Sequence, residues 1–111
     1  MAEKKIVVVQ LSGGNDYLNC IIPYNDPQYV DNRPNVRITE DRVIDIGDGL
    51  GMNPVMAPIK ELWDQGNVAI IHGVGYPVPN RSHFRSMDIW HTAEPTKVGN
   101  EGWLGNAINQ M

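Results

Sequence analysis

Two runs of apolar residues dominate the hydrophobic pattern of the chain. Residues 5–11 (KIVVVQL) and 67–74 (NVAIIHGV) are rich in β-branched side chains and carry apolar residues at both odd and even positions. This pattern is typical of central strands that are covered on both faces. The first run leads into Gly13-Gly14-Asn15-Asp16, and the second leads into a segment rich in glycine and proline.

A helix is predicted between these two runs. Asn53 can cap it, Pro54 suits its first position, and Gly66 suits a left-handed end. Pro58 falls inside the first turn, where a missing N–H costs little. The apolar residues of this segment form one stripe at helical spacing: Val55, Met56, Ile59, Leu62 and Trp63. A helix that leads into a buried strand implies a crossover onto a parallel sheet, so we predict an α/β fold.

Shorter elements are predicted between these helix and strand segments. Residues 26–29 should form a short helical turn that Arg33-Pro34 closes. Residues 36–38 and 43–46 alternate apolar and polar positions, which indicates an edge hairpin or meander. The glycines of residues 47–51 should form a loop.

Two further helices are predicted toward the C-terminus. One begins near Ser82 and ends near Thr92, with Phe84, Met87 and Trp90 or His91 facing inward. Another begins at Trp103, and its apolar positions are Leu104, Ala107, Ile108 and Met111. This last pattern has no stop signal. We therefore expect residues 1–111 to be part of a longer α/β domain that continues past the C-terminus.

Composition and charge narrow the possible partners. The 111 residues are 41% hydrophobic and 20% charged, which is ordinary for a folded domain. The net charge is -4 and the basic residues are not clustered, so we expect no nucleic-acid or membrane partner. Cys20 is the sole cysteine, cannot form an internal disulfide, and is expected to be a small buried hydrophobe. Neither a signal peptide nor a membrane span is recognisable, so the chain as written is expected to be cytoplasmic.

The first candidate site follows the first apolar run. In a parallel α/β sheet, ligands bind outside the carboxyl ends of the strands, where both runs would end. Asp16 could bind a hard divalent cation, and Asn15 could donate its amide to a bound oxyanion. Gly13 and Gly14 would let the backbone approach a ligand closely. A plain strand-to-loop turn uses the same residue types and remains open as the alternative.

The second candidate site lies at the start of the helix near Ser82. Ser82 is either a plain N-cap or a nucleophile at a helix N-terminus that favours anions. Arg81 is a candidate anion clamp, and His83 is either a base, a ligand or simply solvated. His72 is expected to be a core histidine. The three tryptophans are expected in the core rather than as platforms for a substrate: Trp63, Trp90 and Trp103.

These segments together resemble a known family. The stretches VVVQLSGGNDYLNCIIPY, RPNVRI and MNPVMAPIKELWDQGNVAIIHGVGYPVPNRSHFRSMDIWHTAEP are similar to the N-terminal portion of bacterial domain-of-unknown-function 1501 (DUF1501) proteins. The similarity covers residues 5–103, and the pairing of GGND with NRSHF makes it specific. These proteins resemble the alkaline phosphatase and sulfatase superfamily. The resemblance implies a parallel-sheet, three-layer α/β/α fold with one or two metals at the carboxyl ends of the strands.

The resemblance also implies roles for individual residues. Asp16 takes the place of the acidic metal ligand after the first strand, and the metal would be zinc, magnesium, manganese or calcium. Ser82 falls near the helix N-terminus that holds the nucleophile of characterised members. The sulfatase pattern around a modified cysteine is absent, since His83-Phe84-Arg85 follow Ser82. Many relatives begin with a twin-arginine export leader, which residues 1–11 do not show, so we expect either a cytoplasmic member or a protein with a different start.

The resemblance leads to a functional hypothesis. The chain would be the N-terminal part of a metal-dependent hydrolase of small anionic phosphate or sulfate esters. Ser82 would be the nucleophile, with Asn15, Arg81 and His83 binding the substrate. Relatives are several times longer and draw further ligands from their C-terminal half, so this chain would be inactive without the remainder of its domain. The alternatives are a non-catalytic binding or scaffold protein and, more weakly, a small intact domain that binds a nucleotide-type ligand.

Overall fold

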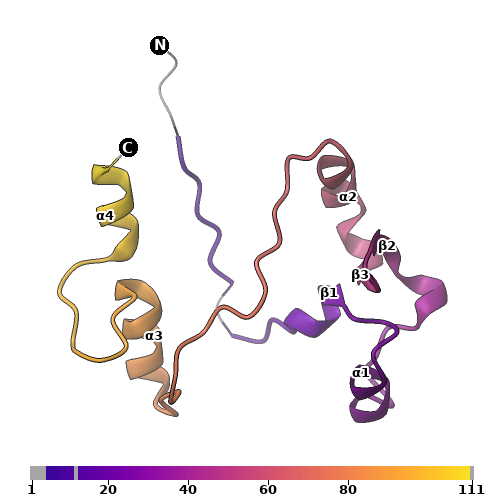
Figure 1. Ribbon diagram of the computed structural model, residues 1–111, viewed down its shortest axis with the longest axis horizontal. Helices are drawn as coiled ribbons and strands as arrows, with labels where there is room; N and C mark the ends of the chain where they lie inside the picture. The colour runs from indigo at the N-terminus through magenta and orange to yellow at the C-terminus, as the bar shows by residue number, and fades with distance from the viewer. Residues whose placement is uncertain (1–4, 12, 111) are drawn as a thin grey trace. The chain divides into compact units, whose positions relative to one another are not determined.

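The computed structural model describes residues 5–11 and 13–110. The chain divides into two compact units, unit 1 (Met1–Ala69) and unit 2 (Ile70–Met111), and each is described by itself. In unit 1 the elements are the 3₁₀ turn η1 (Tyr17–Asn19), β1 (Ile21–Ile22), α1 (Pro27–Asn32), η2 (Glu40–Arg42), β2 (Ile44–Gly47), β3 (Leu50–Met52), η3 (Pro54–Met56) and α2 (Ala57–Asp64) (Figure 1). In unit 2 they are α3 (His83–Thr92) and α4 (Trp103–Asn109).

The predicted parallel three-layer α/β/α fold is wrong. The strands of the described residues form one three-stranded sheet in the order β1-β3-β2, and both pairs are antiparallel. Ile21 lies opposite Met52, and Ile44 lies opposite the same Met52 from the other side. Residues 5–11 and 67–74, which we predicted as the central strands, belong to no strand.

A tight local turn explains which strands pair. Asp48 and Gly49 have φ values of 54° and 73°, and they join Gly47 to Leu50, which are paired in the ladder. Two consecutive residues with positive φ characterise a type I′ hairpin turn, for which Asp-Gly is a favoured sequence. Such a hairpin needs two connecting residues, whereas a parallel pair needs a long crossover and cover on both faces. The segment predicted as a glycine loop is therefore the turn of a hairpin and part of β3.

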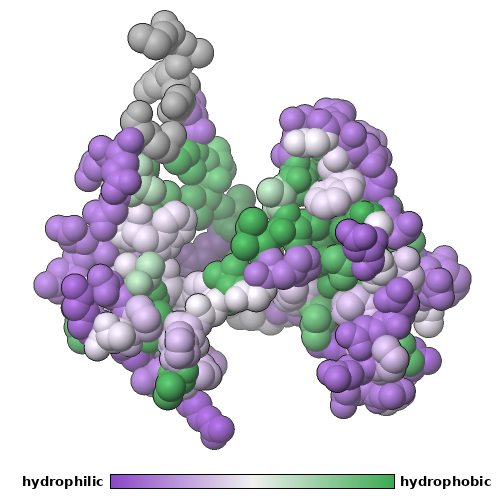
Figure 2. Space-filling view, in the orientation of Figure 1, coloured by the Kyte–Doolittle hydropathy of each residue, from purple (hydrophilic) through white to green (hydrophobic). Residues whose placement is uncertain are grey.

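Much of the two apolar runs is exposed in the described chain, although Val68 and Ile70 are half-buried. Val7 and Val9 are 87% and 78% exposed in the first run, and Ile71 is 72% exposed in the second. Figure 2 shows hydrophobic surface along the N-terminal run, next to the grey atoms. A continuous apolar pattern predicts burial, but it does not identify the segment that provides the cover.

The core of unit 1 is small and lies on the sheet. Its buried side chains are Ile21, Ile22, Tyr29 and Met52, of which Ile22 and Met52 are fully buried. Tyr29 comes from α1 and the other three come from β1 and β3. In unit 2 the buried hydrophobic residue among those described is Ile89 of α3.

The predicted helix starts are confirmed by their capping bonds. The side-chain oxygens accept from backbone N–H groups as follows: Asp26 from Gln28 (2.8 Å), Asn53 from Val55 (3.1 Å) and Ser82 from Arg85 (3.4 Å). Gly66 has a φ of 72° and donates its N–H to Trp63 O, so it ends α2 as predicted. The first turn after Asn53 is the 3₁₀ turn η3 rather than α-helix.

Several predictions of buried side chains are wrong. Phe84 is 88% exposed, and Met87 and Trp90 are 37% and 48% exposed, whereas Ile89 is the buried residue of α3. His72, predicted as a core histidine, is exposed.

The lone cysteine and the C-terminal helix differ from their predicted environments too. Cys20 is half-buried, with its Sγ 3.4 Å from Asn15 Oδ1. Trp103 is 47% exposed at the start of α4, and Trp63 is half-buried. Met111, predicted on the apolar face of the last helix, lies outside the described residues. None of the helices in the described ranges is both long enough and apolar enough to cross a bilayer.

Candidate functional site

The loop before Asp16 is a tight turn that requires glycine at one position. Gly13 has a φ of 91°, and its carbonyl accepts the N–H of Asn15 at 2.9 Å. A Cβ added at Gly13 or Gly14 would meet nothing within 4 Å in the described chain. The positive φ of Gly13, rather than the close approach of another group, is therefore what glycine provides here.

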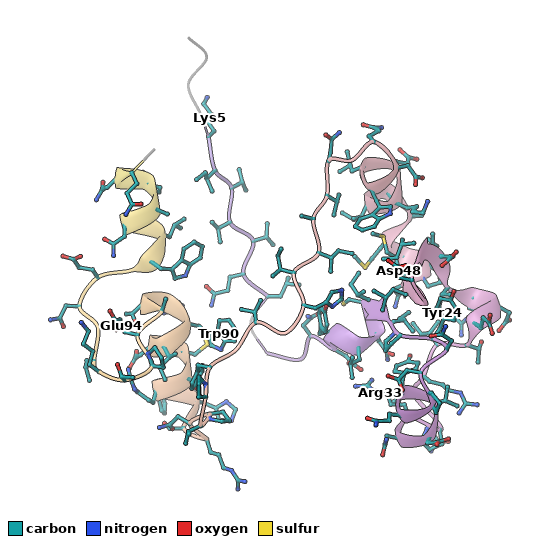
Figure 3. All side chains as sticks on the ribbon, viewed as in Figure 1. Lys5, Tyr24, Arg33, Asp48, Trp90 and Glu94 are labelled. Atoms are coloured by element: carbon teal, nitrogen blue, oxygen red, sulfur yellow. The ribbon has the colours of Figure 1, made fainter. Side chains whose placement is uncertain are left out.

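The carboxylate of Asp16 is held by the guanidinium of Arg33. Arg33 Nη1 lies 2.6 Å from Asp16 Oδ2, and Nη2 lies 3.0 Å from Oδ1. This two-pronged contact is the geometry that arginine forms best with a carboxylate. The hydrogen bonds from Arg33 lower the pKa of Asp16, and the same bonds raise the pKa of Arg33. Arg33, labelled beside α1 in Figure 3, also lies 5.7 Å from the centre of the Tyr29 ring.

A polar network fixes this ion pair on the core of unit 1. The Tyr29 hydroxyl donates to Asn19 Oδ1 at 2.7 Å and accepts from the N–H of Ile38 at 2.9 Å. Asn19 Nδ2 donates to Val36 O at 2.9 Å, and Asn53 Nδ2 donates to Asn19 O at 2.7 Å. The loop that carries Asp16 is thus tied to α1 and to the start of η3.

The described residues do not form a complete metal site, and we predicted only part of one. A hard divalent cation needs several oxygen ligands, and both oxygens of Asp16 already accept bonds from Arg33. No group of three His, Cys, Asp or Glu side chains within residues 5–11 and 13–110 is arranged to hold a metal ion. The role of Asp16 that the structure shows is that of an ion-pair partner.

The loop before α3 is built around Asn80. Its Oδ1 accepts the N–H of Ser82 at 2.8 Å, and its carbonyl accepts the hydroxyl of Ser86 at 2.7 Å. Its own N–H donates to the Tyr76 hydroxyl at 3.2 Å. These bonds fix the backbone around Ser82, which is the N-cap residue of α3.

Ser82 lies between two exposed basic side chains. Arg81, Ser82 and His83 are all exposed and consecutive, and Ser82 Oγ accepts the N–H of Arg85. In the described part of the chain, Ser82 Oγ has no carboxylate or imidazole as a hydrogen-bond partner. The helix N-terminus and the Arg81 guanidinium can attract an anion, but among the described residues Ser82 Oγ is not hydrogen-bonded to a base that would activate it.

The structure separates the predicted site residues into two groups. Asn15 and Asp16 belong to unit 1, and Arg81, Ser82 and His83 belong to unit 2. Asn15 Oδ1 contacts Cys20 Sγ.

Several residues that shape these loops were missed in the sequence. Arg33 and Asn80 contact the predicted residues directly, and Tyr76 and Ser86 complete the network around Asn80. The proximity of Asn80 to a capping serine is a local signal for a fixed turn, whereas Arg33 lies 17 positions from Asp16 with no such signal.

Comparison with protein-family models, with curated proteins and with solved structures found no match to this chain.

Proposed function

We propose that the chain supplies the serine and anion-binding loop of a hydrolase of small phosphate or sulfate esters, as its resemblance to DUF1501 proteins implies. One observation supports the proposal above the others. Ser82 caps the ten-residue helix α3, is exposed, and stands between exposed Arg81 and His83. This arrangement is suited to an anionic ester at a hydroxyl nucleophile.

Each side chain has a defined task in this proposal. The unpaired N–H groups of the first turn of α3 and the guanidinium of Arg81 bind the nonbridging oxygens of the ester. His83 adds a further donor on the first turn, and Ser82 is placed to attack phosphorus or sulfur.

In this proposal, the described chain binds the ester but does not hydrolyse it. Ser82 lacks a base among its described partners, and the ligands that would complete a metal site with Asp16 are absent from the described ranges. The proposed partner is therefore further polypeptide of the same domain, which would cover residues 5–11 and 67–73 and add the missing ligands. The exposure of Val7 and Ile71 supports such a partner.

The experiment measures binding and turnover of p-nitrophenyl phosphate and p-nitrophenyl sulfate. We expect calorimetric binding of at least one ester and no release of p-nitrophenol, with or without Mg²⁺, Mn²⁺ or Zn²⁺. Arg81→Ala should weaken binding about fivefold, which is the scale of a coupling near 1 kcal/mol for an exposed charged contact. Arg42→Ala, which changes another exposed arginine in unit 1, should leave binding unchanged. Equal losses in the two variants would contradict the proposal.

A second candidate is a non-catalytic binding or scaffold protein, and one observation favours it. Arg33 already neutralises Asp16, the residue that a metal-dependent hydrolase would need as a free ligand. The two functions separate when Ser82→Ala is tested in a longer polypeptide that contains this chain. If the longer polypeptide hydrolyses the ester and Ser82→Ala abolishes this turnover, the protein is a hydrolase. If the unsubstituted polypeptide shows no turnover and Ser82→Ala still binds its partner, the protein is a scaffold.

A further inference from the structure

Residues of unit 2 form an apolar cavity that is partly open to solvent. Its volume is about 490 Å³, within the range of roughly 300–1,000 Å³ that small-molecule sites occupy. Its walls come from the segment before α3, from α3 and the loop that follows it, and from the start of α4. They include Tyr76, Pro77, Ile89, Trp90, Pro95 and Trp103.

One arginine fixes the wall that follows α3. Arg85 Nη2 donates to the carbonyls of Lys97 at 2.6 Å, Glu94 at 3.0 Å and Pro95 at 3.5 Å. Pro95 is itself a wall residue, and Glu94, which follows α3, is labelled in Figure 3 together with Trp90. The loop is therefore held in place before any ligand binds, which reduces the ordering cost of binding.

The end of α3 is fixed in the same region. Ala93 adopts a left-handed conformation with a φ of 58°, and its N–H donates to Ile89 O at 2.7 Å. Ile89 is 5% exposed and contributes to the cavity wall. These contacts place Trp90 at a defined turn of the helix, next to the cavity.

The ring of Tyr76 is held in the cavity wall by the contacts of its hydroxyl. Its hydroxyl accepts from the N–H of Asn80 at 3.2 Å and lies 3.5 Å from Ser86 Oγ. The Ser86 hydroxyl proton is committed to the carbonyl of Asn80 at 2.7 Å. The phenolic proton of Tyr76 is therefore the one available for donation, with Ser86 Oγ as a distant acceptor.

The lining excludes a charged ligand. None of the residues that form the walls carries a charged side chain. An ion would lose its hydration there without gaining a partner, which is costly. Two indoles and a phenol ring instead offer flat apolar faces, which stack on planar rings.

We propose that the cavity of unit 2 binds an uncharged, planar aromatic small molecule against the indoles of Trp90 and Trp103. The cavity walls include none of Arg81, Ser82 and His83, although Tyr76 also contacts Asn80 of the loop that carries Ser82.

The test uses the full chain and the uncharged fluorophore N-phenyl-1-naphthylamine. We expect one saturable site per chain, seen as increased probe fluorescence and quenching of tryptophan emission in a Trp63→Phe background. Trp103→Ala should weaken binding about tenfold, the scale for removing one aromatic anchor. Phe84→Ala, on the same helix as Trp90 but 88% exposed and outside the walls, should leave affinity unchanged.

A second variant protects the test against loss of folding. Gly75 is a wall residue at which an added Cβ would meet nothing within 4 Å, so Gly75→Leu can fill the cavity without a backbone clash. It should abolish probe binding while the circular dichroism spectrum stays unchanged. The proposal is overturned if Gly75→Leu and Trp103→Ala bind the probe normally, or if Phe84→Ala weakens binding equally. Tighter binding of the anionic 8-anilinonaphthalene-1-sulfonate, or self-association that Trp103→Ala abolishes, would also overturn it.

Discussion

The fully buried Met52 provides the sharpest test of the sheet. It lies in the middle strand, opposite Ile21 on one side and Ile44 on the other, and it is 0% exposed. Met52→Ala removes three heavy atoms, worth about 2.4 kcal/mol at roughly 0.8 kcal/mol per methylene-sized group. The cavity left behind adds to this loss, since buried methionine-to-alanine changes cost about 2–5 kcal/mol. We therefore expect the free energy of unfolding of unit 1 to fall by about 3 kcal/mol.

Urea denaturation measures this change through the fluorescence of Trp63, which lies in unit 1. Trp90 and Trp103 are replaced by phenylalanine so that unit 2 does not contribute to the signal. Leu62→Ala is the control, because this aliphatic side chain of α2 is 44% exposed and should cost about 1 kcal/mol. Equal losses for Met52→Ala and Leu62→Ala would refute the antiparallel sheet as the core of unit 1.

Two further predictions concern the strand backbone and the ion pair. Gly51→Ala should destabilise unit 1 by about 2 kcal/mol in the same urea assay, because the new Cβ would lie 2.7 Å from Val43 Cβ. Gly14→Ala is the control: its Cβ would meet open space, so it should change stability by less than about 0.5 kcal/mol. Arg33→Gln should raise the pKa of Asp16 toward its ordinary value, as measured by carbon NMR of the carboxyl group. In the wild type this ion pair stabilises the folded state at pH values above the ordinary carboxyl pKa, and the stabilisation is lost as the pH falls through the lowered pKa of Asp16. Arg33→Gln should therefore remove this part of the pH dependence of the free energy of unfolding. An unchanged Asp16 titration would contradict the role of Arg33.

Local signals predicted the helices well. The capping residues Asp26, Asn53 and Ser82 each act on a backbone N–H two or three positions away, so the sequence contains both partners within one turn. Gly66 is equally local, since its positive φ ends α2 within the same turn.

Long-range pairing could not be predicted in this way. An apolar run on both faces indicates burial without naming a partner, so residues 5–11 and 67–74 were assigned to a parallel sheet that the structure does not form. The Asp48-Gly49 turn was the available signal for the true hairpin, and it was missed because the neighbouring glycines indicated a loop.

In the candidate site, too, local features could be predicted from the sequence and long-range contacts could not. Ser82 at a helix start follows from local sequence, whereas the bond from Arg33 to Asp16 depends on how α1 packs against the sheet. The carboxylate that looked free for a metal was therefore already paired.

The most direct test of the proposed function is a phosphate titration followed by backbone amide NMR. We predict saturable shifts in the amides of residues 81–85 at the start of α3, and their loss in Arg81→Ala. Shifts spread over the basic residues of both units, or none at residues 81–85, would contradict an anion-binding loop at Ser82.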